Sequence, residues 1–537
     1  MTTVQPLAAT AERESGGLAR PLNAGPSGRE PTGADPPRFW WLKRGGVGTF
    51  LLLVALTAVR LVWGWESQRR LERILDPVVA RGEPLRVSQL EQPKLDDKVN
   101  GLAYLRNAAG AVNRGAWSPS NTGMNFDAAY TPYSPNWHAV AGPSVAANAK
   151  VFPLARQARA QDKFDFGVTF ATPAVVTSPG PLDPLRILAN TLRDSAEWAH
   201  EMGDDAAALE TIRDMRHESV ALWSQPFIID ELVGIGIDQS ANAMILEIAP
   251  GLRIIDGAAP PPPVSATAGP FPPAAPLSAP RGVTRANVHR LIDELLDDIA
   301  ANQGMNRALA GERVVHLDAA EHVARFAPVL RPMFELDAVR MLEVDAILED
   351  AASKPDWPAA SAVMVRAPVW PTTAPSAGRR QPIDHTRTLG SNLVSLSGLS
   401  RAIEHILRAR AERRMAAVSL AAQLYRADTG RWPVSLNALV PRYLPSLPFD
   451  PMSKHPEPLR YLLSRGALPG GRDRPVVYSA GANGVFDTKD ASSLPPGPTY
   501  SWNRGPDEWR DLERWKPAAT QPTTTPTPGA STQAADH

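Results

Sequence analysis

The chain has 537 residues, with no cysteine, 54 prolines, and 56 basic residues balanced by 56 acidic ones. The lack of cysteine excludes a thiol nucleophile, an iron–sulfur cluster, a cysteine-ligated zinc and a disulfide scaffold. A net charge of zero argues against nucleic-acid binding, because neutralising phosphates requires a basic surface. The length predicts roughly two to four domains with sizeable cores.

The strongest single signal is the apolar run over 45–65, which reads GGVGTFLLLVALTAVRLVWGW. At about 1.5 Å per residue, a helix of this length reaches roughly 30 Å, the thickness of the hydrocarbon core. Trp40 and Trp41 lie before the run, and Trp63 and Trp65 lie at its end, where tryptophan favours the membrane interfaces. A buried core helix and a cleaved signal peptide are the alternatives, but the long preceding tail fits a cleaved signal poorly. We therefore expect a retained signal anchor.

Orientation does not follow from charge, because the basic residues on the two sides are balanced: Arg38, Lys43 and Arg44 against Arg69, Arg70 and Arg73. The simplest topology for one anchor keeps the short N-terminal tail inside. We therefore expect a single-pass inner (cytoplasmic) membrane protein with a cytoplasmic N-terminus and extracytoplasmic or periplasmic C-terminal domains.

Apolar residues recur three and four positions apart over 66–255 and 283–354, which predicts a helical domain in two parts. The clearest stripe comprises Val288, Leu291, Ile292, Leu295, Leu296 and Ile299. Asp204 and Asp205 follow Gly203, an arrangement that predicts the end of one helix and the start of the next. The predicted fold is mainly α, a helical-hairpin bundle. Its hairpins resemble tetratricopeptide-like pairs, although no regular period of about 34 residues is present.

Four segments rich in proline and small residues lack the apolar periodicity that would offset the entropy of ordering. We expect disordered tails at 1–44 and 517–537, a Pro-rich loop at 256–282 and a second loop at 355–394.

The C-terminal part combines a helix expected at about 399–428 with three motifs: YRADTGRWP at 425–433, LVPRYLP at 439–445 and VVYSAGANG at 476–484. In this order, over about 395–490, they resemble the globular domain of the type II secretion major pseudopilin. The resemblance implies a small α+β module at 395–516. The chain departs from that family because no prepilin peptidase site precedes the span, and more than 300 residues separate the span from the pseudopilin-like helix.

In the pseudopilin family the last loop can bind calcium, and Asn483, Asp487 and Asp490 stand near the matching position. Carboxylates and backbone carbonyls are the ligands that calcium prefers. Because Lys489 lies between the two acids, a solvated turn is the alternative to a calcium site. No other cofactor is expected.

Motifs for a nucleophile elbow, a phosphate-binding loop, a dinucleotide-binding fold and a zinc protease are absent from the sequence. The best remaining polar cluster comprises Glu312, His316, Asp318, Glu321 and His322. On a helix the two histidines fall on different faces, so we interpret the cluster as salt-bridged surface residues. Four aromatics, Trp117, Tyr130, Tyr133 and Trp137, either line a carbohydrate or peptide groove or pack within loops.

These observations predict a membrane-anchored extracytoplasmic protein with a non-enzymatic interaction or scaffold role. The alternative is an accessory component of a type II secretion or pilus-like machine. The expected partners are the membrane, through one helix, and other proteins, with pseudopilins or secretion proteins as candidates.

Overall fold

The computed structural model describes residues 39–116, 118, 135–180, 182–256, 281–365, 396–463, 475–481, 484–486 and 509–510. These residues are mainly helical, which confirms the predicted class. The chain divides into two compact units, residues 1–62 and residues 63–537, and each is described by itself.

Helix α1 runs without interruption over Trp40–Ala80, so the predicted span and the apolar stripe that follows it form one helix. In the part of the chain that the structure describes, α1 is the one helix long and apolar enough to cross a membrane. Its apolar side chains in the first unit, from Val47 to Val62, are exposed. In the second unit, Ser67 and Val78 of the same helix are buried.

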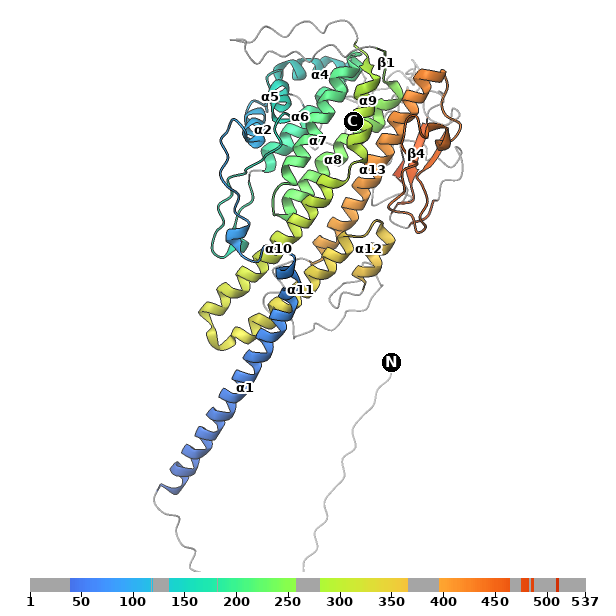
Figure 1. Ribbon diagram of the computed structural model, residues 1–537. Helices are drawn as coiled ribbons and strands as arrows, with labels where there is room; N and C mark the ends of the chain where they lie inside the picture. Colours follow the sequence, from blue (N-terminus) through green and yellow to red (C-terminus); the bar gives the residue numbers. More distant parts are fainter. Residues whose placement is uncertain are drawn as a thin grey trace, which may run out of the picture. The chain divides into compact units, whose positions relative to one another are not determined.

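The first half of the second unit is a series of packed helices: α2 (Gly101–Gly110), α4 (Pro135–Ala147), α5 (Val151–Ala158), α6 (Leu182–Glu201), α7 (Asp205–Leu222) and α8 (Ile228–Ile248). Helix α7 packs against both α6 and α8, as Figure 1 shows. The predicted helix boundary at Gly203 is confirmed, because Gly203 has φ +77° and the Asp204 side chain accepts a hydrogen bond from the Ala207 N–H.

The second half begins with a parallel pair, β1 (Ile254–Ile255) and β2 (Val283–Thr284), which places the residues flanking the Pro-rich segment side by side. The helices that follow are α9 (Arg285–Leu296), α10 (Ile299–Phe326), α11 (Arg331–Ala352) and α12 (Trp357–Met364). Helices α10 and α11 form a hairpin, seen in yellow in Figure 1. Short 3-10 turns lie at Val87–Gln89, Ala174–Val176, Ala249–Gly251, Pro328–Leu330 and Leu436–Leu439.

The C-terminal part consists of α13 (Leu396–Thr429) and a three-stranded antiparallel sheet of β3 (Arg460–Leu463), β4 (Pro475–Ser479) and β5 (Trp509–Arg510). Helix α13 packs along α8 and α9, so it contributes to the helical core. Strand β4 is buried on both faces: Val477 joins the main core, while Val476 and Tyr478 pack with Leu462 and Phe486.

Two carboxylates connect the three C-terminal motifs. Asp428 in the first motif accepts a 2.6 Å hydrogen bond from the Tyr443 hydroxyl in the second. Asp450, just after the second motif, accepts hydrogen bonds from the Ser479 hydroxyl at 2.7 Å and the Ala480 N–H at 2.8 Å in the third. Gly430 has φ +74° where the helix ends, as its position in the first motif predicts.

Candidate functional site

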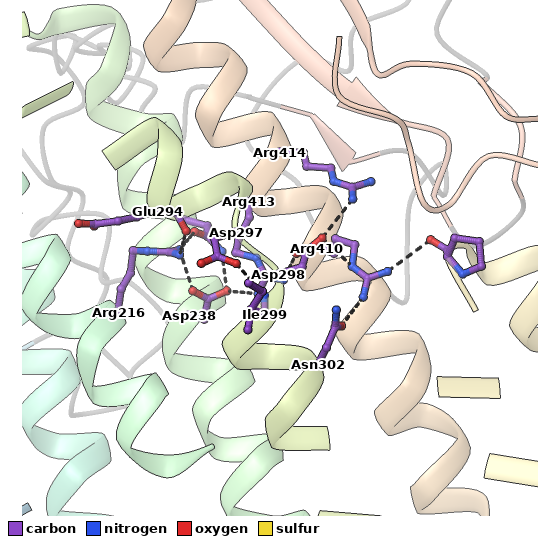
Figure 2. Close-up of polar contacts among 12 residues, drawn as sticks. Arg216, Asp238, Glu294, Asp297, Asp298, Ile299, Asn302, Arg410, Arg413 and Arg414 are labelled. Atoms are coloured by element: carbon purple, nitrogen blue, oxygen red, sulfur yellow. Dashed lines mark hydrogen bonds and ion pairs between the residues drawn. The ribbon is translucent and has the colours of Figure 1, made fainter. Parts of the chain in front are cut away.

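The most unusual feature of the fold is a group of buried charges where α8, α9, α10 and α13 meet. Helix α13 contributes Arg410, Arg413 and Arg414, which its close packing on α8 and α9 turns away from solvent. Asp298 lies between the end of α9 and the start of α10. We refer to these residues, together with Asp238 of α8 and Arg216 of α7, as the arginine cluster (Figure 2).

Asp298 is shared by the three α13 arginines of the cluster. Its carboxylate lies 3.2 Å from Nε of Arg410, 2.6 Å from Nη2 of Arg413 and 3.1 Å from Nη2 of Arg414. Burial alone would raise the pKa of Asp298, but the three guanidinium groups outweigh it and hold the pKa below its ordinary value. Asp298 is therefore ionised at neutral pH.

Asp238 is the second carboxylate of the cluster. Its oxygens lie 2.8 Å from Nη1 of Arg216 and 3.2 Å from Nη1 of Arg413, and the Asn242 amide donates to it at 3.0 Å. Arg216 also donates to the backbone carbonyl of Glu294 at 3.1 Å. The cluster thus links α7, α8, α9, α10 and α13 through charge-assisted hydrogen bonds.

Positive charge exceeds negative charge in the arginine cluster, because four guanidinium groups meet two carboxylates. Burial lowers the pKa of Arg410, and repulsion from Arg413 and Arg414 lowers it further. This excess would stabilise a small anion brought close to the cluster.

A cavity of about 340 Å³ opens beside Arg410. Its lining includes Asp298 and Asn302 from the start of α10 and Ser353 and Lys354 from the end of α11. Arg410 donates to the side-chain Oδ1 of Asn302 at 2.6 Å, so its guanidinium is held at the wall. Two cations, Arg410 and Lys354, outnumber the one carboxylate, Asp298, in this lining, which gives the cavity the chemistry of a site for a carboxylate or phosphate group.

Three further acids are buried on α7 and α8: Glu218, Asp230 and Glu231. Their carboxyl oxygens have no hydrogen-bond partner among the residues that the structure describes. Burial raises the pKa of Asp230 to about 7 and the pKa values of Glu218 and Glu231 well above their ordinary range. The charges of Arg413 and Arg307 lower the pKa of Glu231, but burial outweighs them and the net pKa is raised.

The interpretation of the 312–322 cluster as surface residues was wrong for its first half. His316 is buried, and its Nδ1 lies 3.1 Å from Asp345 of α11. Burial lowers the pKa of His316, but the hydrogen bond and charge of Asp345 outweigh this, so the net pKa is raised. Burial also raises the pKa of Glu312. Asp318, in contrast, accepts a hydrogen bond from the Ala174 N–H. The sequence correctly predicts a helix for these residues, but it does not reveal that α11 covers one face of that helix.

Two other predicted sites lie partly or wholly outside the described residues. Trp137 is buried against Trp198, so it packs in the interior, whereas Trp117, Tyr130 and Tyr133 lie outside the described residues. Asn483, Asp487 and Asp490, the expected calcium ligands, also lie outside them. Within the described ranges, no group of three or more His, Asp or Glu side chains is arranged to hold a metal ion.

Comparison with known proteins gives no further guide: no family model matches the chain, and no similar curated protein or solved structure was found.

Proposed function

We propose that this chain is a single-pass inner-membrane protein whose helical unit lies outside the cytoplasm and has a non-enzymatic interaction or scaffold role. Helix α1 carries the proposal, because it is long and apolar enough to cross a membrane and none of the residues in its most apolar stretch is buried. An apolar helix in the core of a soluble protein would instead be covered by other elements. The packed helical hairpins of α6, α7 and α8, with their tetratricopeptide-like order, supply the surface for a protein partner.

Extraction of membranes with alkaline carbonate tests the anchor. We expect the full chain to stay in the membrane pellet, and a Leu53→Arg, Leu56→Arg double variant to be released, because each arginine at the centre of a span costs about 2.5–3.5 kcal/mol. Val79→Arg is the matched control, since Val79 is exposed on the same helix beyond the apolar run. Release of the unaltered chain would contradict the proposal.

A second candidate function is an accessory role in a type II secretion or pilus-like machine. Two hydrogen bonds favour it: Tyr443 donates to Asp428, and Ser479 donates to Asp450. They hold the segments that carry the three pseudopilin-like motifs together. In this role the C-terminal module would contact true pseudopilins or other secretion proteins.

Co-purification in mild detergent tests the second candidate. We expect a pseudopilin or secretin to be recovered with the unaltered chain and lost with Val434→Glu, which places a charge on an exposed apolar position of the module. Val176→Glu changes another exposed valine, in the helical part, and should leave recovery unchanged. Recovery of neither protein with the unaltered chain would favour the scaffold role.

The same resemblance supports the proposal of a calcium site at Asn483, Asp487 and Asp490. Bound calcium would stabilise the folded protein and raise its melting temperature. Thermal melting with calcium and with a chelator tests this, and identical midpoints would contradict it.

A further inference from the structure

The turn between α10 and α11 exposes a group of apolar side chains. Phe326 is 79% exposed and Val329 is 73% exposed, and Val323 and Leu330 are exposed beside them. We refer to these four residues as the apolar tip. Scattered exposed apolar residues are normal on soluble proteins, but a contiguous group at the end of a hairpin marks a contact surface.

Two contacts fix how α11 lies along the second-unit part of α1. The Ser67 hydroxyl donates a 2.5 Å hydrogen bond to Glu335, and the Arg81 guanidinium lies 3.5 Å from Glu349. Arg81 directly follows the last residue of α1, and the two contacts are fourteen residues apart in both segments, so the end of α1 and α11 run side by side in the same direction and in register. Figure 1 shows α11 next to the end of α1.

This register places the apolar tip at a definite level along α1. Moving one helical turn from the Ser67–Glu335 contact toward the N-termini of both helices brings Arg331 to the level of Trp63. Leu330 and Val329 immediately precede Arg331, in the turn Pro328–Leu330, so they lie near that level. Trp63 and Trp65 end the apolar run, and tryptophan favours the membrane–water interface.

The residues around the apolar tip also suit a lipid surface. Arg325 and Arg331 flank the turn in the chain, with side chains 64% and 63% exposed, and each pairs along its own helix with one glutamate, Glu321 and Glu335 respectively. Exposed arginines beside exposed apolar groups allow the apolar groups to enter the headgroup region while the guanidinium groups meet lipid phosphates.

We propose that the apolar tip inserts into the headgroup region of the same membrane that α1 spans. The inference rests on the proposed function, because it requires α1 to be the anchor. A bilayer is the occupant we favour over a protein, since the level of the tip coincides with the tryptophans that mark the membrane interface. The hairpin then gives the helical unit a second point of contact with the membrane.

Depth-dependent fluorescence quenching tests the inference. The chain has no cysteine, so a single introduced cysteine can carry an environment-sensitive fluorophore without further changes. Full-length variants are compared in phosphatidylcholine–phosphatidylglycerol vesicles with and without nitroxide-labelled lipid. The first three are Val329→Cys in the tip, Leu52→Cys in the apolar run and Val434→Cys in the C-terminal module. All three positions are exposed side chains, so each variant should fold. Phe326→Cys is a second tip position.

We expect blue-shifted emission and strong nitroxide quenching at positions 329, 326 and 52, and neither effect at position 434. Quenching at position 52 without quenching at positions 329 and 326 would overturn the inference and leave the anchor intact. A blue shift at position 329 without nitroxide quenching would also overturn it, because protein would then cover the tip. Absence of quenching at position 52 would overturn the anchor, and the inference with it.

Discussion

Asp298 is the residue on which the arginine cluster depends, because one carboxylate serves the guanidinium groups of Arg410, Arg413 and Arg414. Asp298→Ala would leave these cations buried with less negative charge to balance them. We expect the free energy of unfolding to fall by about 3–5 kcal/mol, the usual cost of removing one partner from a buried ion pair.

Urea unfolding of the detergent-solubilised chain, followed by circular dichroism, measures this loss. Asp350→Ala is the control, because Asp350 is half-exposed and pairs with Lys354 one helical turn away. It should cost less than about 1 kcal/mol. Equal losses for the two variants would contradict the importance of the cluster.

Asp230 predicts a dependence of stability on pH. Its carboxyl is buried without a hydrogen-bond partner among the described residues, and burial raises its pKa from an ordinary 3.8 to about 7. The folded state therefore binds a proton that the unfolded state has already lost between these pH values. This bound proton makes its full contribution to the free energy of unfolding below about pH 4, and the contribution is lost as pH rises through 7.

Asp230→Asn removes the titrating group while keeping nearly the same shape. We expect the variant to gain stability relative to the unaltered chain as pH rises from 4 to 8, measured by thermal melting across that range. Asp162→Asn, at an exposed position, should show no such trend. A constant difference between Asp230→Asn and the unaltered chain at all pH values would contradict the buried, protonated state.

At the scale of helices, two glycines predict opposite effects of the same substitution. A Cβ added to Gly311 of α10 would meet the Pro226 carbonyl oxygen at 1.8 Å, in the turn between α7 and α8. Gly311→Ala should therefore force α10 away from that turn and destabilise the fold by roughly 1–3 kcal/mol or more.

Gly236→Ala is the matched control within α8, because nothing lies within 4 Å of its added Cβ. It should raise the free energy of unfolding by up to about 1 kcal/mol, since alanine favours a helix interior over glycine. Chemical denaturation of both variants measures the difference. Similar effects for the two would show that α10 does not pack closely on the α7–α8 turn.

Much of the helical framework could be predicted because local sequence determines it. The spacing of Val288, Leu291 and Leu295 indicates the buried face of α9, and the Gly203–Asp204 pair indicates a helix boundary. The apolar run of β4 likewise indicates a strand end before a turn. The two-residue strand pairs could not be predicted, because they depend on partners distant in the chain.

The arginine cluster could not be predicted, because arginines at 410, 413 and 414 look like the solvated face of an amphipathic helix. The packing of α13 on α8 and α9 buries Arg410 and Arg413 and partly buries Arg414. One signal was available for the buried acids: α8 is apolar on most of its surface, so Asp230, Glu231 and Asp238 within it had little chance of reaching solvent.

At the scale of the whole molecule, the folded unit is held together without disulfides, since the chain has no cysteine. Helix α13 completes the core and provides three cations for Asp298 and, beside Arg216 of α7, one for Asp238. Deleting residues 396–537 would expose the apolar faces of α8 and α9 and leave both acids with fewer cationic partners. We expect this truncation to lose cooperative unfolding and to become sensitive to limited proteolysis. An unchanged cooperative transition would show that the helices before α13 fold alone.

The central claim is that one helix anchors the chain and that the helical unit lies outside the cytoplasm. Reporter fusions after Lys516 test this most directly, using one enzyme that is active only outside the cytoplasm and one fluorescent protein that folds only inside it. The account predicts enzyme activity and no fluorescence from these fusions. Fluorescence without enzyme activity would place the helical unit in the cytoplasm and contradict the account.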